Sequence, residues 1–277
     1  MDLKLLDLFS GIGGFSYAAE KIVGGYKTTQ FVEKNPYCKS VLHKNFPNIP
    51  IHNDIKTFSA KKGQFDIFTI GFPCQDLSVA GRQKGIGEGT RSGLFYESIR
   101  LLREVRPRFA IFENVRNLLS IKEGRLFQEV LFQIAQTGNY EIEWAVVSAK
   151  DLGACHLRER LWIIAYSNDY GSSSTERIRV NGKADSSTQK GQNKISESQG
   201  GSKSSNSRII QHTSKWRNLK HRLSSDWKGY VSEPTLRRGD DGLSNRVARI
   251  KALGNSIVPN CAAVPLQRIK DLSEGKC

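Results

Sequence analysis

At 277 residues the chain can bury one large core, alone or with a small appended domain. Its formal net charge of +15 favours a polyanionic partner, most simply nucleic acid, but says nothing about the fold. No apolar run approaches the roughly 20 residues of a membrane span, and the five cysteines form no CxxC pair, so we expect free thiols, no membrane association and no structural metal site.

The N-terminal stretch reads as a strand, a glycine turn and a helix. Residues 4–9 predict a strand that begins without a signal peptide, so we expect a cytoplasmic protein. A glycine-rich turn follows at residues 10–14, and apolar side chains then recur at helical spacing. Such turns cradle nucleotide-like ligands, because the backbone comes close and the helix N-terminus offers free amides. The spacing is not GxGxxG, so a ligand with a nucleoside and a carboxylate fits better than a dinucleotide, and a plain strand-to-helix turn remains an alternative.

Acidic residues follow the next two predicted strands. Residues 28–32 predict the second strand, and Glu33 stands at its carboxyl end, roughly 20 residues after the turn, where such folds place an acid for ribose hydroxyls. A solvated acid is an equally good interpretation of Glu33. Asn35 and Pro36 predict the start of a helix that runs to Phe46. Residues 49–55 predict a third short strand, near the end of which stands Asp54.

A Pro-Cys pair follows the fourth predicted strand, at residues 65–69. Open α/β sheets carry their chemistry at the carboxyl ends of strands, and Pro73 stiffens the backbone before Cys74. Cys74 is therefore as good a candidate for a nucleophile as for a small buried apolar residue. The polar, glycine-rich residues 81–93 have the composition of a mobile lid, which carries the basic residues Arg82, Lys84 and Arg91.

Predicted helices and strands alternate as far as residue 167. Helical spacing predicts helices at 94–105 and from about 127 to 138, and apolar or alternating patterns predict strands at 109–112, 140–149 and 160–165. Together they indicate a parallel-rich α/β sheet. Glu113 follows the fifth strand and Arg158 and Arg160 stand at the start of the last, where each alone would read as a surface charge.

The composition changes after Ser167. Residues 171–207 are rich in serine, glycine and polar side chains and can scarcely build a core. Residues 198–225 contain no acid and interleave basic with aromatic residues, as a nucleic-acid-binding surface does, although a solvated basic loop is the alternative. Lys215 and Arg217 are the candidate contacts, Trp216 lies between them, and residues 261–272 predict a C-terminal helix.

Five short motifs occur in a fixed order: DLFSGIGGF at 7–15, GFPCQ at 71–75, ENV at 113–115, HLRER at 156–160 and ALGNSIVP at 252–259. In this order they resemble the cytosine-5 DNA methyltransferases, particularly the compact phage and prophage type. The resemblance implies an α/β fold, a class I (Rossmann-like) S-adenosylmethionine-dependent methyltransferase sheet with a small, poorly packed target-recognition insertion. It implies a catalytic and cofactor-binding domain at 1–167, a recognition region at 168–244 and a segment at 245–277 that returns to the catalytic domain.

The resemblance also implies which residues hold the cofactor, S-adenosylmethionine. Its methionine part would be wrapped by Phe9, Ser10, Gly11, Gly13 and Gly14. Glu33 would bind the ribose hydroxyls, and Asp54 with Ile55 would recognise the adenine. The amino-acid end would be held by Asn255 and Ser256.

For catalysis, the resemblance implies that the Cys74 thiolate adds to carbon 6 of a flipped-out cytosine, which makes carbon 5 reactive. Glu113 would hydrogen-bond to ring nitrogen 3 and the exocyclic amine, and Arg158 and Arg160 would contact the base, the phosphates or the Cys74 region. The substrate would be double-stranded DNA, with further contacts from Arg82, Lys84, Arg91, Lys215 and Arg217.

The implied activity is that of a DNA (cytosine-5-)-methyltransferase acting as a monomer. A restriction endonuclease for the same site would be its partner, but the sequence leaves open whether one exists. Transfer RNA as the substrate and a binding protein without chemistry are the alternatives, and the glycine spacing disfavours a dinucleotide oxidoreductase. His156 stands where the family usually has glutamine, and we expect it to alter the support of the arginine pair.

Overall fold

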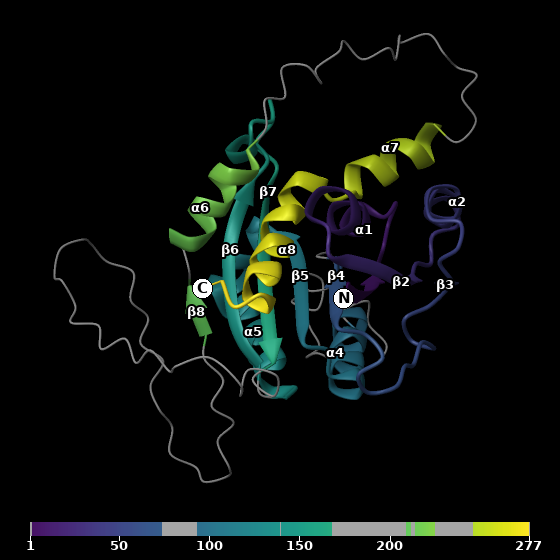
Figure 1. Cartoon of the computed structure of the whole chain (residues 1–277), viewed down its shortest axis with the longest axis horizontal. Coiled ribbons are helices and arrows are strands. Elements are labelled where there is room, and N and C mark those ends of the chain that lie inside the picture. Colours follow the sequence, from purple (N-terminus) through teal and green to yellow (C-terminus); the bar gives the residue numbers. More distant parts are fainter. Residues whose placement is uncertain are drawn as a thin grey trace, which may run out of the picture.

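The computed structural model describes residues 2–73, 93–138, 140–167, 209–211, 214–224 and 246–276. These residues form a mixed eight-stranded sheet in the order β3-β2-β1-β4-β5-β7-β6-β8, with helices on both faces (Figure 1). The strands are β1 (Leu3–Leu8), β2 (Tyr26–Val32), β3 (Ile51–His52), β4 (Ile67–Ile70), β5 (Phe109–Val115), β6 (Tyr140–Ser148), β7 (Glu159–Ser167) and β8 (Ile209–Gln211). The predicted α/β class with a parallel-rich sheet is confirmed.

Most of the predicted site residues lie at one end of this sheet. β1 pairs in parallel with β2 and β4, and β4 pairs in parallel with β5, so their carboxyl ends share one edge. β7 runs antiparallel to β5, with Val115 opposite Arg160, and therefore begins where β5 ends. We call this end of the sheet the carboxyl edge.

Helices cover each face because the strand side chains alternate between two apolar cores. On one face lie α4 (Gly93–Val105) and α5 (Arg125–Gln136), whose apolar sides pack on residues such as Leu6, Phe68 and Phe112. On the other lie α1 (Gly14–Tyr17), its π-helical continuation η1 (Ala18–Val23), α6 (Ser214–Leu223) and α8 (Pro259–Ser273). The remaining helices are α2 (Pro36–Asn45), α7 (Arg246–Asn255) and three short 3₁₀ turns, η2 (Arg116–Leu119), η3 (Ile121–Gly124) and η4 (Lys150–Leu152).

Most predicted elements are present, with three additions. β3 is shorter than predicted, whereas β5 extends through the Glu-Asn-Val motif. β8, α6 and α7 lie in stretches for which no element was predicted; β8 pairs with β6, and α6 packs on α8 (Figure 1). None of the described helices combines the length and apolar composition that a bilayer crossing requires.

Candidate active site

The glycine turn after β1 has the geometry that its composition predicts. Gly13 has a φ of 87°, and a Cβ there would lie 2.7 Å from Cε2 of Phe46, so no other residue fits without displacing that ring. Phe9 also adopts a left-handed conformation, with a φ of 56°. A Cβ on Gly11 would meet no atom within 4 Å, so the turn leaves open space beside its backbone. A ligand can approach the main chain closely there.

Glu33 holds this turn through its side chain. Its Oε2 accepts a hydrogen bond of 2.7 Å from the N–H of Gly11, and its Oε1 accepts one of 2.7 Å from the N–H of Asn35. Asn35 in turn caps α2, because its side chain accepts from the backbone N–H groups of Tyr37 and Cys38. The carboxylate is partly buried and fixed by two amides, and its remaining lone pairs can accept hydrogen bonds from ligand hydroxyls.

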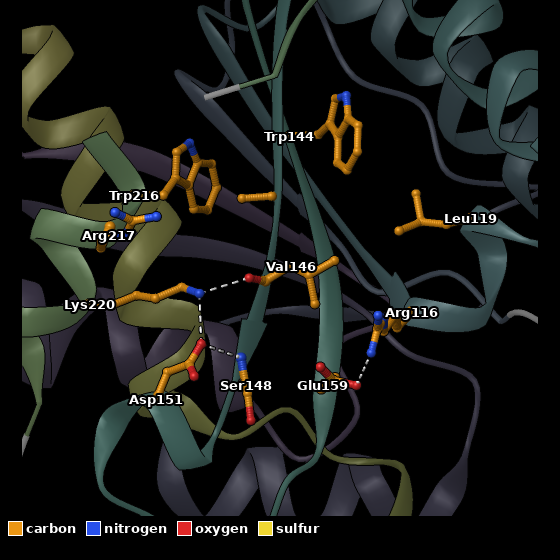
Figure 2. Close-up of a pocket in the computed structure, with 11 residues that line it drawn as sticks. Arg116, Leu119, Trp144, Val146, Ser148, Asp151, Glu159, Trp216, Arg217 and Lys220 are labelled. Carbon is orange, nitrogen blue, oxygen red and sulfur yellow. Dashed lines mark hydrogen bonds and ion pairs between the residues drawn. The ribbon is translucent and has the colours of Figure 1, made fainter. Parts of the chain in front are cut away.

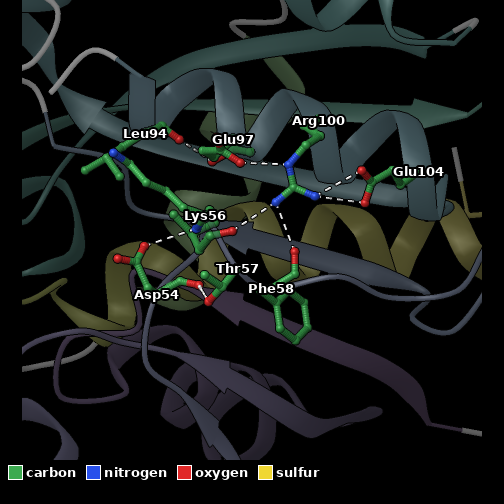
Figure 3. Close-up of polar contacts among 10 residues, drawn as sticks. Asp54, Lys56, Thr57, Phe58, Leu94, Glu97, Arg100 and Glu104 are labelled. Atoms are coloured by element: carbon green, nitrogen blue, oxygen red, sulfur yellow. Dashed lines mark hydrogen bonds and ion pairs between the residues drawn. The ribbon is translucent and has the colours of Figure 1, made fainter. Parts of the chain in front are cut away.

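Asp54 and Ile55 follow β3 in a loop held by α4 (Figure 3). Nη2 of Arg100 donates to the carbonyls of Ile55 at 2.9 Å and Phe58 at 3.0 Å, while the rest of the guanidinium is fixed by Glu97 and Glu104. A hydrogen bond from the N–H of Lys56 and the nearby charge of Lys34 hold the pKa of Asp54 below its ordinary value. Asp54 is thus a charged acceptor, and Ile55 beside it is buried.

Asp7 joins the glycine turn to the strand before the Pro-Cys motif. Its carboxyl group is buried; Oδ2 accepts from Ser16 Oγ of α1 at 2.8 Å, and Oδ1 accepts from Thr69 Oγ1 of β4 at 2.9 Å. Burial raises the pKa of Asp7 to about 7, against the lowering effect of the two hydroxyl donors. The buried carboxyl group of Asp7 therefore connects α1, which follows the glycine turn, to β4, which precedes the Pro-Cys motif.

Glu113 and Arg160 form an ion pair at the carboxyl edge. Nε of Arg160 lies 3.0 Å from Oε1 of Glu113, and both side chains are largely shielded from solvent, with 21% and 13% exposed. Burial raises the pKa of Glu113, and the positive charges of Arg160 and Arg158 partly offset that rise. A Cβ on Gly71 would lie 3.8 Å from the other Glu113 oxygen, so this carboxyl group borders the Pro-Cys turn.

Asn114 supports the same turn from the neighbouring position. Its Nδ2 donates to the carbonyl of Phe72 at 3.1 Å, and its Oδ1 accepts from the N–H of Val115 at 2.8 Å. Because Phe72 precedes Pro73, Asn114 fixes the last carbonyl before the motif. The structure thus brings the Glu-Asn-Val motif to the residues just before Cys74, through a side chain as well as through the pairing of β4 with β5.

Arg158 ties the closing motif to the edge. Its Nη2 donates to the carbonyl of Gly254, in the last turn of α7, and to that of Ser256, between α7 and α8. Ile257 follows, and a Cβ on Gly14 would lie only 3.1 Å from the Ile257 carbonyl, so the glycine permits close packing of the first motif on the last. Asn255 and Ser256 are therefore held near the glycine turn, with Asn255 exposed.

Several predicted site residues are not among those that the structure brings together at the site. Cys74, Arg82, Lys84 and Arg91 fall outside the described residues, as does the side chain of Lys215 on α6. Arg217 is exposed on α6, far in sequence from the motifs. His156 is exposed, and the hydrogen bonds of Arg158 and Arg160 within the described residues do not involve it.

Sequence reasoning missed the supporting residues of the site, namely Asp7, Ser16, Thr69, Arg100, Asn114 and Ile257. Asp7 carried one usable signal, because an acid inside an apolar strand must find donors when it is buried. Trp216 was interpreted as part of a basic, aromatic surface, but it is only 1% exposed and belongs to the core beneath α6. The spacing of Trp216, Leu219 and Leu223 is the helical signal that could have identified this packing.

Known proteins are similar to this chain over a large part of its length. A family model described as C-5 cytosine-specific DNA methylase matches residues 3–259. The Type II methyltransferase M.Bsp6I of Bacillus sp. (strain RFL6) is 32% identical over 168 residues, which cover 60% of this chain and 53% of that protein. M.HhaI of Haemophilus parahaemolyticus, also a Type II methyltransferase, is 35% identical over 168 residues, covering 60% and 50%.

Solved structures agree with this match. The crystal structure of a protein described as a DNA modification methyltransferase encoded within a prophage (E. coli) superposes with a TM-score of 0.50 at 25% identity, covering 61% of this chain and 47% of that one. The chain thus spans about half the length of the relatives that it matches.

Proposed function

Because the chain belongs to the C-5 cytosine-specific DNA methylase family, we propose that it transfers a methyl group from S-adenosylmethionine to carbon 5 of cytosine in double-stranded DNA. The observation that supports the proposal is the meeting of Glu113, Arg160 and residues 71–73, which precede Cys74, at the carboxyl edge.

The residues present suit the proposed cofactor. The open space beside Gly11 admits a ligand to the turn, Glu33 offers a fixed carboxylate to ribose hydroxyls, and Asp54 with Ile55 offers an acceptor and an apolar surface to the adenine. Asn255 and Ser256 would hold the amino-acid end. S-adenosylmethionine supplies an electrophilic methyl group on its sulfonium.

In the proposed reaction, the thiolate of Cys74 adds to carbon 6 of a base flipped out of the duplex, and electron density moves to carbon 5. The carboxyl group of Glu113 hydrogen-bonds to ring nitrogen 3 and the exocyclic amine, where charge develops during the addition. Burial raises the pKa of Glu113, and this makes it easier for the carboxyl group to take up a proton and share it with nitrogen 3. After methyl transfer, loss of the carbon 5 proton and release of Cys74 complete the cycle.

The two arginines have separate tasks in this proposal. Arg160 orients Glu113 through the ion pair, while Arg158 fixes the closing motif that borders the cofactor site. We propose further that the protein acts as a monomer in the cytoplasm. Since the relatives named above are Type II methyltransferases, a restriction endonuclease that cuts the same sequence would be its partner.

The first test is methylation-aware sequencing of plasmid DNA from a methylation-free host that expresses the chain. We expect cytosines in one sequence context to resist conversion. The variant Cys74→Ser should abolish this protection while retaining affinity for S-adenosylhomocysteine, because the serine cannot supply a thiolate. Complete conversion with the wild-type chain, or undiminished protection with Cys74→Ser, would contradict the proposal. If the chain methylates RNA but not DNA, the substrate is RNA and the DNA part of the proposal is wrong.

A further inference from the structure

A groove of about 470 Å³ runs along the free part of β6, beside the site described above (Figure 2). Trp144, Ala145, Val146 and Ser148 of β6 line it. Arg116 and Leu119 of η2 and Glu159 of β7 line one side, and Trp216, Arg217 and Lys220 of α6 line the other. β8 pairs with β6 only from Ile142 to Trp144, so the described part of β8 leaves this length of β6 uncovered.

The groove opens at the carboxyl edge. Glu159 lies opposite Ser148 in the sheet, and its neighbour Arg160 lies opposite Val115. Arg116 follows Val115 directly, three positions after Glu113. One end of the groove is therefore adjacent to the proposed site of the target cytosine, and the other leads away from it under α6. A nucleic acid whose target base lies at Glu113 would therefore reach the groove only with the nucleotides to one side of that base.

Two arginines in the groove are available to a ligand. Arg116 pairs with Glu159 at 2.7 Å, but the two side chains are 60% and 36% exposed, and such solvated pairs contribute little and exchange readily. Arg217 is exposed and makes no ion pair with any residue that the structure describes. Lys220 is already occupied: its Nζ binds Asp151 at 2.7 Å and the Val146 carbonyl at 2.9 Å. It therefore holds α6 in place and neutralises Asp151, the other acid of the groove lining besides Glu159.

An aromatic side chain, Trp144, lines the same groove as these arginines. The indole of Trp144 is half-buried, and Phe127 supports it edge-on with ring centroids 5.0 Å apart. A rigid aromatic face and guanidinium groups in one groove suit the sugars and phosphates of a nucleic-acid strand, because the arginines meet the charge and the indole packs against the sugar or a base. The high net positive charge of the chain agrees with such a ligand.

We infer that this groove binds the phosphodiester backbone of duplex DNA on one flank of the target cytosine, with Arg116 and Arg217 as the phosphate contacts and Trp144 as the packing surface. This inference rests on the proposed function and names a second contact region for the same substrate. Arg116 exchanges Glu159 for a phosphate when DNA binds. The contribution is independent of base sequence, because backbone contacts position a duplex without reading it.

The test compares two double variants with equal loss of charge. Arg116→Gln/Arg217→Gln removes the groove cations, and Arg103→Gln/Arg125→Gln removes two exposed arginines from α4 and α5 as the matched control. Fluorescence anisotropy gives the Kd for a duplex of about 24 base pairs over a range of salt concentrations. We expect the groove variant to bind roughly tenfold more weakly and its salt slope to fall by about 2, one for each phosphate contact. The control should match the wild type.

Duplex length supplies a second measurement. A duplex of about 8 base pairs centred on the target should not reach the groove, so the groove variant should bind it as the wild type does. The inference would be overturned if the groove variant bound the long duplex with an unchanged Kd and salt slope, or if it lost affinity equally for both duplexes. It would also be overturned if the wild-type chain bound RNA more tightly than DNA through the same two arginines. Unchanged affinity for S-adenosylhomocysteine excludes misfolding as the cause of a loss.

The two proposals fail separately. A wild-type chain that binds DNA through the groove but transfers no methyl group contradicts the proposed function alone. A wild-type chain that methylates DNA while the groove variant binds the long duplex normally contradicts the groove alone.

Discussion

Asp7 lies where the glycine turn and the strand before the Pro-Cys motif meet, and its carboxyl group is wholly buried. Two hydroxyl donors satisfy it, but they supply no positive charge, and Glu33 nearby adds a negative one. An ionised carboxylate is therefore unfavourable at this position, which is why its pKa lies near 7. The neutral acid can still hydrogen-bond to both hydroxyl groups, accepting from one and donating its proton to the other, so the connection between the two elements persists when the proton is bound.

We predict that Asp7→Asn removes a pH-dependent part of the stability. In the folded protein Asp7 keeps its proton up to about pH 7, whereas in the unfolded chain it loses it near the ordinary value of 3.8. Between these values the folded state binds more protons, so the free energy of unfolding should fall as the pH rises, by about 1.4 kcal/mol per pH unit. The contribution is complete below pH 4 and lost above about pH 7.

Urea unfolding of both proteins at pH 5, 6, 7 and 8 measures this effect. The difference, wild type minus Asp7→Asn, isolates the residue, because the other titrating groups are common to both. It should decrease from pH 5 to 7 and then level off. Parallel stability curves for the two proteins would show that Asp7 is ionised in the fold at neutral pH.

The motifs of the site could be located from the sequence, because short glycine, Pro-Cys and Glu-Asn-Val patterns in a fixed order are specific. The supporting roles of single residues could not be predicted, whether the residue lies inside a motif, as Asn114 does, or outside one, as Arg100 does. These roles depend on carbonyls of residues 72, 55 and 58, which are distant in sequence and come close only in the fold. Ile257 likewise depends on its approach to Gly14.

At the scale of elements, α4 determines the position of the loop after β3. That loop has little regular structure of its own, and the Arg100 guanidinium replaces the missing strand pairing with two hydrogen bonds to carbonyls (Figure 3). Glu97 and Glu104 hold the guanidinium in place from the preceding and following turns of the helix. The proposed adenine contacts of Asp54 and Ile55 thus depend on a residue more than 40 positions away.

We predict that Arg100→Ala weakens cofactor binding. Without the clamp the loop samples other conformations, and the lost charge-assisted hydrogen bonds correspond to about 1.5 kcal/mol, or a Kd for S-adenosylhomocysteine about tenfold higher by titration calorimetry. Arg103→Ala, an exposed arginine on the same helix, is the control and should leave the Kd unchanged. Equal affinity for Arg100→Ala and the wild type would mean that the loop holds its shape without the clamp.

The elements that sequence reasoning missed share a physical cause. β8 has three residues, fewer than any periodic pattern needs, and is defined by its pairing with β6. α6 has four basic side chains within a stretch without acids, and that charge obscured its few apolar positions. By contrast, α4 and α5 were predicted because their apolar residues recur along a whole face, which the core confirms. Short elements with mixed composition are determined by tertiary contacts rather than by local pattern.

At the scale of the whole molecule, the basic segment after residue 208 is attached to the catalytic sheet rather than separate from it. Trp216 and Leu219 enter the same core as α8 and η1, and Lys220 bonds to the backbone of β6. The exposed cations of α6 are thereby held at a fixed distance from the carboxyl edge. A strongly basic protein can then direct part of its charge at the flank of the proposed DNA substrate instead of distributing all of it evenly.

This attachment predicts a large effect for one buried side chain. Trp216→Ala empties a site that is 1% exposed in the wild type, and loss of a buried aromatic residue costs about 3 to 5 kcal/mol. We expect the urea midpoint to fall accordingly, while Asn218→Ala, an exposed position on the same helix, should change the free energy of unfolding by less than about 0.5 kcal/mol. A midpoint unchanged by Trp216→Ala would mean that α6 detaches without disturbing the core. In that case the salt dependence of the Kd for DNA should also be the same for the wild type and Trp216→Ala, because the cations of a detached helix already move independently of the sheet.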